Sequence, residues 1–149
     1  MKSCLGIIVA IGLASPAFGQ QAVNPEGIYQ LNIAKSTLRG PAVKSQTISY
    51  SGDGFTATGF SFAGQPFTIM AAVIADGKSH PMMGSPNYDA TTYTQVDPYT
   101  ISISRTKAGK VVETGTRIVN PDGKTIWITA IGTNAAGQSY SHVLVFEKQ

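Results

Sequence analysis

The chain has 149 residues, of which 13% are charged, and a formal net charge of +3. Its lysines and arginines are scattered over predicted turns and form no basic stripe, which argues against a nucleic-acid partner. The single cysteine, Cys4, lies close to the N-terminus, so neither a disulfide nor a thiolate metal site is expected.

Residues 1–19 have the pattern of a secretory signal peptide. A lysine precedes an apolar run over residues 5–13, and small residues follow at Ala17 and Gly19. We expect cleavage near Gly19. Because the run is too short to span a bilayer, no membrane span is expected in the mature chain. Residues 20–149 then form a single domain that is exported, either to the periplasm or to the extracellular space.

From residue 27 onward the chain predicts an all-β fold. Short runs rich in Thr, Ile, Val, Tyr and Phe are separated, about every eight to twelve residues, by Gly, Pro, Asn or Asp. We expect strands near 27–33, 45–51, 54–62, 66–75, 78–82, 89–96, 99–106, 110–119, 124–133 and 138–147. The longer connection over residues 34–44 leaves room for one helical turn around Ser36.

Most of these connections are short, so sequential strands are expected to pair as antiparallel neighbours in an up-and-down meander. A meander of about 8–10 strands has two exposed edges. Closing it into a barrel removes both edges, and we therefore predict a closed barrel.

The turns determine which side chains face inward. Pro121 fixes φ at roughly −65°, so Asn120-Pro121-Asp122-Gly123 fits a type I turn with a glycine bulge that pairs Asn120 with Lys124. We interpret the turns that end at Gly109 and Gly137 in the same way. One face then carries Ser102, Ser104, Val112, Thr114, Thr116, Ile118, Ile126, Ile128, Ala130, Tyr140, His142, Leu144 and Phe146.

We predict that this uncharged face is the interior, because burying an unpaired charge is costly. Arg105, Glu113 and Arg117 then lie outside. The alternative is a register with a two-residue turn, which would place Ile126 and Ile128 on the same side as Glu113 and Arg117.

The predicted interior grades from apolar to polar along its strands. Ligand pockets combine apolar walls with a few placed polar groups, so we predict that it binds a small apolar or amphipathic molecule. The predicted cavity lining is Thr114, Thr116, Ile126, Ile128, Tyr140, His142, Leu144 and Phe146. The alternative is a filled interior, in which the polar groups bond one another or trapped water.

Trp127 falls on the predicted outer face, opposite Arg117. A cation–π contact with Arg117 would shield its ring. The alternative is that Trp127 marks a partner surface with Ile131, Val143 and Val145. The chain would then be a non-enzymatic structural or interaction protein of the envelope.

No arrangement of residues predicts an enzyme. His142 has no carboxylate on its predicted face to act with it in acid–base chemistry. His80, Met82 and Met83 group one imidazole and two thioethers, which are soft ligands suited to copper, although methionines packing the barrel mouth explain them equally well. We therefore expect no catalytic residue, no metal and no cofactor.

Three stretches carry a resemblance to known proteins. They are Gly27-Ile28-Tyr29-Gln30-Leu31-Asn32 with Lys35-Ser36, then Asp76-Gly77-Lys78 with Pro81 and Gly84-Ser85-Pro86, and then Gly109-Lys110-Val111 through Gly132-Thr133-Asn134-Ala135-Ala136-Gly137-Gln138. With these stretches the chain resembles a group of exported bacterial small β-barrel proteins of uncharacterised function.

More distantly, the chain resembles the calycin architecture of lipocalins and fatty-acid-binding proteins. Gly27-Ile28-Tyr29 is similar to the lipocalin opening Gly-x-Trp. The carboxylate-binding Arg-x-Tyr of fatty-acid-binding proteins has no counterpart, because the last strand reads Tyr140-Ser141-His142. The resemblance therefore implies a calycin-like barrel and an internal cavity for an apolar molecule, without a headgroup site.

Overall fold

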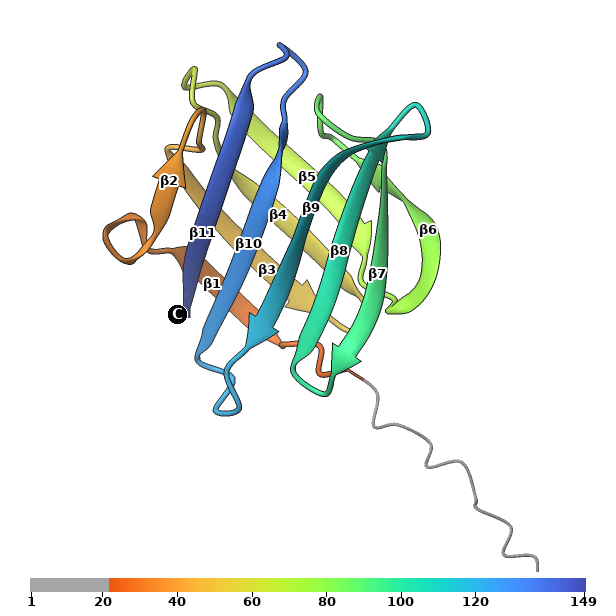
Figure 1. Cartoon of the computed structure of the whole chain (residues 1–149). Helices are drawn as coiled ribbons and strands as arrows, with labels where there is room; N and C mark the ends of the chain where they lie inside the picture. The colour runs from red at the N-terminus through yellow and green to blue at the C-terminus, as the bar shows by residue number, and fades with distance from the viewer. Residues whose placement is uncertain (1–21) are drawn as a thin grey trace, which may run out of the picture.

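The computed structural model describes residues 22–149, so the predicted signal peptide lies outside the described residues (Figure 1). One 3-10 turn, η1 (Ile33–Lys35), accompanies eleven strands in this range. The strands are β1 (Gly27–Leu31), β2 (Thr37–Arg39), β3 (Ser45–Ser51), β4 (Gly54–Phe60), β5 (Pro66–Ala72), β6 (Asp76–Met83), β7 (Ala90–Asp97), β8 (Thr100–Lys107), β9 (Lys110–Val119), β10 (Thr125–Thr133) and β11 (Ser139–Lys148).

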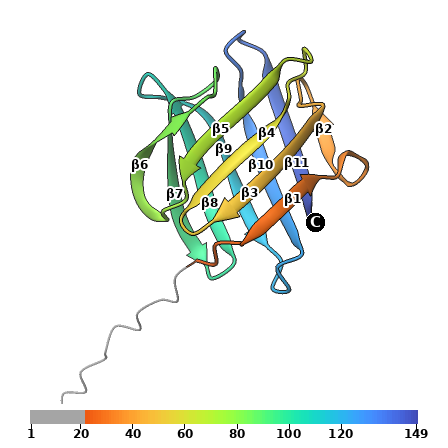
Figure 2. The same cartoon turned by 180° about the vertical axis from the view of Figure 1, so that it is seen from behind.

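The strands form a closed antiparallel barrel. Its order is β1-β3-β4-β5-β6-β7-β8-β9-β10-β11, and β1 pairs with β11 to complete the ring. Figure 2 shows β1, β3, β4 and β5 on the side opposite β8 to β11. The predicted all-β class, the up-and-down meander and the closure are confirmed. Short β2 lies outside the ring and pairs with β11.

The expected helical turn near Ser36 is η1, which packs against β11. The Asn32 side chain accepts a hydrogen bond from Lys35 N at 3.1 Å, and the Ser36 hydroxyl accepts one from Val145 N at 3.0 Å. These bonds fix the entry into β2. Strand β2 was not predicted, because its three residues are too few to show a strand pattern.

The turn between β10 and β11 has the predicted form. Asn134 N donates to Gln138 O at 3.0 Å, and Gly137 N donates to Asn134 O at 2.9 Å. The resulting register pairs Ile126 with Phe146 and Ala130 with His142. The prediction of which side chains of β10 and β11 face inward is therefore correct.

The turn between β9 and β10 is one residue longer than predicted. Gly123 N donates to Asn120 O at 2.8 Å, as in the expected type I turn, but Asn120 N pairs with Thr125 O at 2.9 Å rather than with Lys124. The Asp122 carboxylate accepts the Lys124 N–H instead, at 2.8 Å. This added residue exchanges the two faces of β9 relative to β10.

The turn between β8 and β9 also differs from the prediction. Ala108 and Gly109 have φ of 49° and 77°, so they form a two-residue turn with left-handed backbone at both positions. A bulge between Arg105 and Thr106 then shifts the register. The two strands keep the predicted common face, but that face is now the outer one.

The predicted inward orientation of β8 and β9 is therefore wrong. Ser102, Ser104, Val112, Thr114, Thr116 and Ile118 lie on the outer face, whereas Arg105, Glu113 and Arg117 point into the barrel. Ile126 and Ile128 therefore share the inner face with Glu113 and Arg117, as in the alternative register. That alternative assumed a two-residue turn, whereas the observed turn between β9 and β10 is longer.

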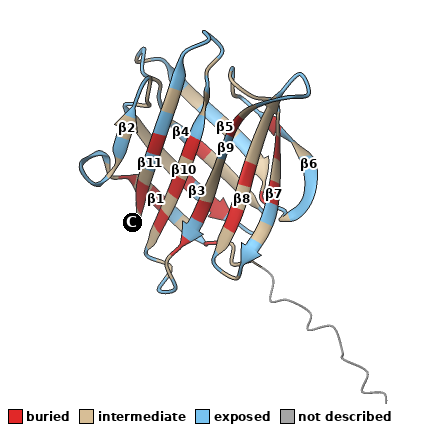
Figure 3. Cartoon of the chain, in the orientation of Figure 1, coloured by how far each residue is buried: buried red, intermediate tan, exposed pale blue. Residues whose placement is uncertain are grey.

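Buried residues lie mostly in the middle and lower parts of the strands, while the upper strand ends are mostly exposed or half-buried (Figure 3). The rings of Tyr29 and Tyr50 meet edge to face with centroids 6.0 Å apart. The Tyr29 hydroxyl donates to Gly123 O at 2.6 Å, which ties β1 to the lower turn of β9 and β10. Tyr29, Ile126 and Phe146 are fully buried, so this end of the barrel is packed.

Candidate functional site

A cavity of about 370 Å³ occupies the barrel interior above this packed end. Its volume lies near the lower end of the roughly 300–1,000 Å³ typical of small-molecule sites. Four loops at the upper end in Figure 1 border it, through Pro41, Ala42 and Val43, Ser61, Phe62 and Ala63, Pro86, Asn87 and Tyr88, and Asn134 and Gln138. The cavity therefore has its mouth at the end of the barrel opposite the Tyr29 contact.

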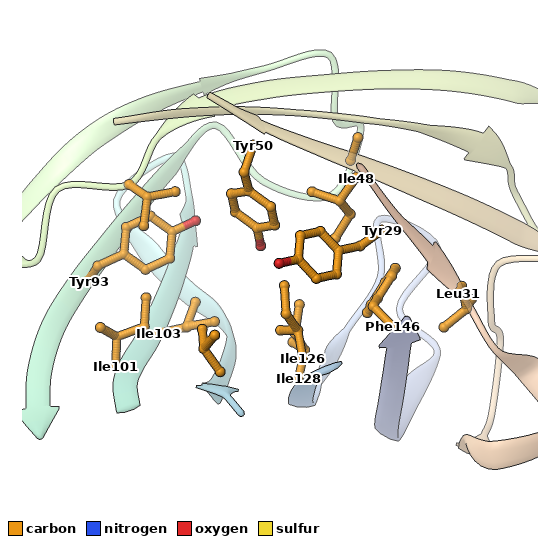
Figure 4. Packing of buried hydrophobic residues seen from close by; sticks show 13 residues of the cluster. Tyr29, Leu31, Ile48, Tyr50, Tyr93, Ile101, Ile103, Ile126, Ile128 and Phe146 are labelled. Atoms are coloured by element: carbon orange, nitrogen blue, oxygen red, sulfur yellow. The ribbon is translucent and has the colours of Figure 1, made fainter. Parts of the chain in front are cut away.

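The body of the cavity is apolar because the inward positions of its strands are mostly aliphatic and aromatic. The wall from β3, β4 and β5 presents Ile48, Tyr50, Phe55, Ala57 and Ile69. The opposite wall presents Ile103, Ile128, Ala130, Leu144 and Phe146. Figure 4 shows Ile48 and Tyr50 pointing across toward Ile128 and Phe146.

Arg117 reaches into the lower part of the cavity from β9. Arg117 is only 3% exposed. Its Nη2 donates to Val23 O at 3.0 Å and to the Asn24 side-chain oxygen at 3.3 Å, so it holds the segment that precedes β1 under the barrel. Its Nε and Nη1 are buried without a hydrogen-bond partner among the described residues.

A chain of polar groups crosses the opposite, upper part of the interior. Glu113 accepts a hydrogen bond from the Tyr140 hydroxyl and forms an ion pair with Arg105. The Arg105 guanidinium lies 4.8 Å from the centre of the Tyr88 ring. Tyr140 on β11 reaches Glu113 on β9 by crossing Gly132 on β10, where a Cβ would lie 2.9 Å from the tyrosine oxygen.

The contacts of this network determine the protonation states of Tyr140 and Arg105. Burial raises the pKa of Tyr140, and the adjacent Glu113 carboxylate raises it further, because ionising the phenol would bring two negative charges together. Burial lowers the pKa of Arg105, but Glu113 and the neighbouring tyrosines outweigh burial and raise that pKa overall. Tyr140 is thus a neutral donor and Arg105 a cation, each directed at Glu113.

His142 lies beside this network and is stacked on Tyr140, with ring centroids 5.0 Å apart. Its Nδ1 accepts the Arg39 N–H at 3.3 Å, and its Nε2 lies 3.0 Å from Pro41 O, to which it donates in that tautomer. Both imidazole nitrogens are therefore engaged by the backbone of β2 and the loop after it. His142 fastens that loop at the mouth and has no free nitrogen for a ligand or for proton transfer.

The structure brings most of the predicted lining residues together. Ile128, Tyr140, His142, Leu144 and Phe146 line the cavity, whereas Ile126 lies in the packed core. Thr114 and Thr116 do not reach the cavity, and their predicted inward orientation is wrong because the faces of β9 are exchanged. Thr116 instead lies on the outer face, where its hydroxyl is 2.9 Å from that of Thr129.

Arg105, Glu113 and Arg117 are interior residues that the sequence pattern did not predict. Their predicted outer position assumed that each charge would be unpaired if buried. The sequence gives little signal for the pair of Arg105 and Glu113, because a two-residue turn alone would place Arg105 opposite Val112, and only the bulge between Arg105 and Thr106 brings Arg105 opposite Glu113. A charge pair at such positions can be buried together.

Two further sequence features take structural roles. The His80 imidazole lies 2.9 Å from an Asp76 carboxylate oxygen, and Met82 is buried while Met83 is exposed. Among residues 22–149, no group of three or more His, Cys, Asp or Glu side chains is placed to hold a metal ion. Trp127 is half-buried on the outer face and pairs with Ile118 and Val145, so the expected contact with Arg117 is wrong.

Over the described part of the chain, no helix is long and apolar enough to cross a membrane. No family model matches the chain, and neither a curated protein nor a solved structure matches it.

Proposed function

We propose that this protein binds a small amphipathic molecule inside its barrel. The observation that carries the proposal is the cavity of about 370 Å³, which has apolar walls and polar groups confined to its lower part and its mouth. The calycin-like arrangement supports the proposal. In calycins, a closed meander of strands with a mouth at one end is expected to enclose apolar ligands. We also propose that the chain is distantly related to the calycins.

The proposed role is binding without catalysis. The two interior groups that could act as a general base are already engaged: Glu113 with Arg105 and Tyr140, and His142 with the backbone of Arg39 and Pro41. A general base needs a free lone pair within reach of a proton on the substrate. These contacts favour a rigid binding site.

The proposal also places the protein outside the cytoplasm, in the periplasm or the extracellular space, because of the predicted signal peptide. Cell fractionation followed by N-terminal sequencing of the protein from its own host tests this part. A first residue at or near Gln20 in the exported fraction is the expected result. Uncleaved protein in the cytoplasmic fraction would contradict it.

Native mass spectrometry of protein purified from its own host tests binding. We expect a mass above that of the bare chain, and an upward thermal shift of delipidated protein with members of a panel of lipids and small aromatic molecules. Two neighbouring substitutions on β11 locate the site. Leu144→Trp fills the cavity and should abolish both signals, whereas Val143→Trp, on the exposed outer face, should leave them unchanged.

Bare chain from the host together with no thermal shift across the panel would contradict ligand binding. Loss of both signals in the Val143→Trp variant, with retention in Leu144→Trp, would place the site on the outer face. That outcome would favour the alternative of an envelope interaction protein that uses the surface around Trp127.

A further inference from the structure

The three arginines of the chain lie in three different electrostatic environments. Arg39 is exposed, and Arg105 is buried against the Glu113 carboxylate. Arg117 is buried as deeply as Glu113, but among residues 22–149 no carboxylate lies within ion-pair distance of it. A buried charge without a partner is costly, so this one calls for a partner of opposite charge.

The neighbours of Arg117 satisfy only part of it. Val23 and Asn24 supply two neutral oxygens to Nη2, and the Tyr50 ring lies 5.6 Å from the guanidinium carbon. The Nε and Nη1 donors stay unpaired and shielded from solvent. An arginine presents five N–H donors and no acceptor, so only an acceptor can satisfy these remaining groups.

Arg117 borders two cavities, and their linings differ. The main cavity offers apolar walls, whereas a second cavity of about 240 Å³ on the other side of Arg117 is lined by Asn24, Gln95 and the carboxylate-bearing Asp76. A negative side chain disfavours an anion in the second cavity. Apolar residues such as Val73, Ile74 and Ile101 also line the second cavity, but the apolar walls of the main cavity are more extensive and give the body of an amphipathic molecule more surface to pack against.

We propose that the ligand is a small carboxylic acid whose carboxylate binds Arg117 and whose apolar body lies between the cavity walls, pointing toward the mouth. This inference rests on the proposed function and specifies its ligand class. A singly charged acid matches the single unpaired cation, because Arg105 is already neutralised by Glu113. Arginine binds carboxylates through charge-assisted hydrogen bonds, which are stronger than those between neutral groups.

The cavity volume limits the size of the acid. About 30 Å³ is the share of one water in the liquid, so 370 Å³ corresponds to about a dozen waters. A methylene group occupies a volume similar to that of a water, which makes an acid of roughly a dozen non-hydrogen atoms a suitable probe. Decanoate has this size, and decanol is its uncharged counterpart.

The test is calorimetric titration of decanoate and decanol into wild type, Arg117→Gln and Arg39→Gln at neutral pH. We expect wild type to bind decanoate more tightly than decanol. Arg117→Gln should weaken decanoate binding about 10- to 100-fold and change decanol binding little, because only the acid uses the charged hydrogen bonds. Arg39→Gln, on the exposed arginine, should behave as wild type.

A second measurement needs no variant. The NMR resonance of the Arg117 Nε–H group should shift when decanoate is added and stay in place with decanol. Equal binding of acid and alcohol, with the Nε–H resonance unmoved, would overturn the carboxylate site while leaving the proposed function intact, with water as the partner of Arg117. No binding of either molecule up to about 1 mM would contradict both the site and the function.

Discussion

Replacing Arg105 by methionine tests whether Arg105 and Glu113 form a buried ion pair. The Arg105 and Glu113 side chains are 14% and 6% exposed, so removing the guanidinium leaves a carboxylate in the interior. Breaking a buried pair by removing one partner costs about 3–5 kcal/mol. Because Tyr140 still donates to Glu113, we expect a value near the lower end, about 3 kcal/mol.

Urea unfolding at neutral pH measures this loss. The double variant Arg105→Met/Glu113→Leu removes both charges, and we expect it to be at least about 2 kcal/mol more stable than Arg105→Met alone. Arg39→Met is the matched control, since an exposed arginine without an ion pair in the described chain should change stability by less than about 0.5 kcal/mol. A loss below about 1 kcal/mol in Arg105→Met, or no recovery in the double variant, would refute the buried pair.

Urea unfolding also distinguishes the contributions of the two interior arginines to stability. Arg117→Met removes a guanidinium that has no carboxylate partner, so it strands no opposite charge. It loses two hydrogen bonds to the segment before β1 but also relieves an unpaired buried charge. We expect it to be clearly less destabilising than Arg105→Met, and an equal or larger loss would mean that Arg117 is neutralised in a way that its contacts do not show.

Three further predictions concern a turn, a glycine within strand β10 and a surface ion pair. Ala108→Asn should stabilise the protein by about 0.5–1 kcal/mol in urea unfolding, because asparagine tolerates the left-handed φ of 49° better than alanine, whereas Ala136→Asn should not. Gly132→Ala should cost about 1–3 kcal/mol, since its Cβ would lie 2.5 Å from Val112 O, while Gly54→Ala, which has room, should be nearly neutral. Lys35, followed by Asn32, holds the pKa of Glu147 below its ordinary value, so this carboxylate favours folding at neutral pH and the contribution is lost as the pH falls through the lowered pKa. Lys35→Met should raise the Glu147 pKa in an NMR titration, and an unchanged value would contradict the contact.

The barrel itself could be predicted because its signals are local. Short glycine-ended turns and alternating strands suffice to indicate a meander, and closure follows from the cost of open edges. The faces of β10 and β11 were also predictable, since the loop that starts at Asn134 has the backbone pairing expected of its type. Five of the predicted lining residues reach the cavity for this reason.

The faces of β8 and β9 could not be derived with the same certainty. Whether Asn120 pairs with Lys124 or with Thr125 depends on a hydrogen bond from Lys124 N to the Asp122 side chain, which competes with the backbone partner. One residue of loop length then decides whether Thr116 or Arg117 faces inward. The charge argument failed at the same point, because Arg105 and Glu113 neutralise each other only in the correct register.

The most direct test of a ligand-binding interior is an isotope-filtered NMR experiment on labelled protein with unlabelled decanoate. We predict nuclear Overhauser contacts from the ligand methylenes to Ile128, Leu144 and Phe146, which line the cavity. Contacts only to the outer residues Ile118, Ile131 or Val143, or no contact at saturating ligand, would contradict binding inside the barrel.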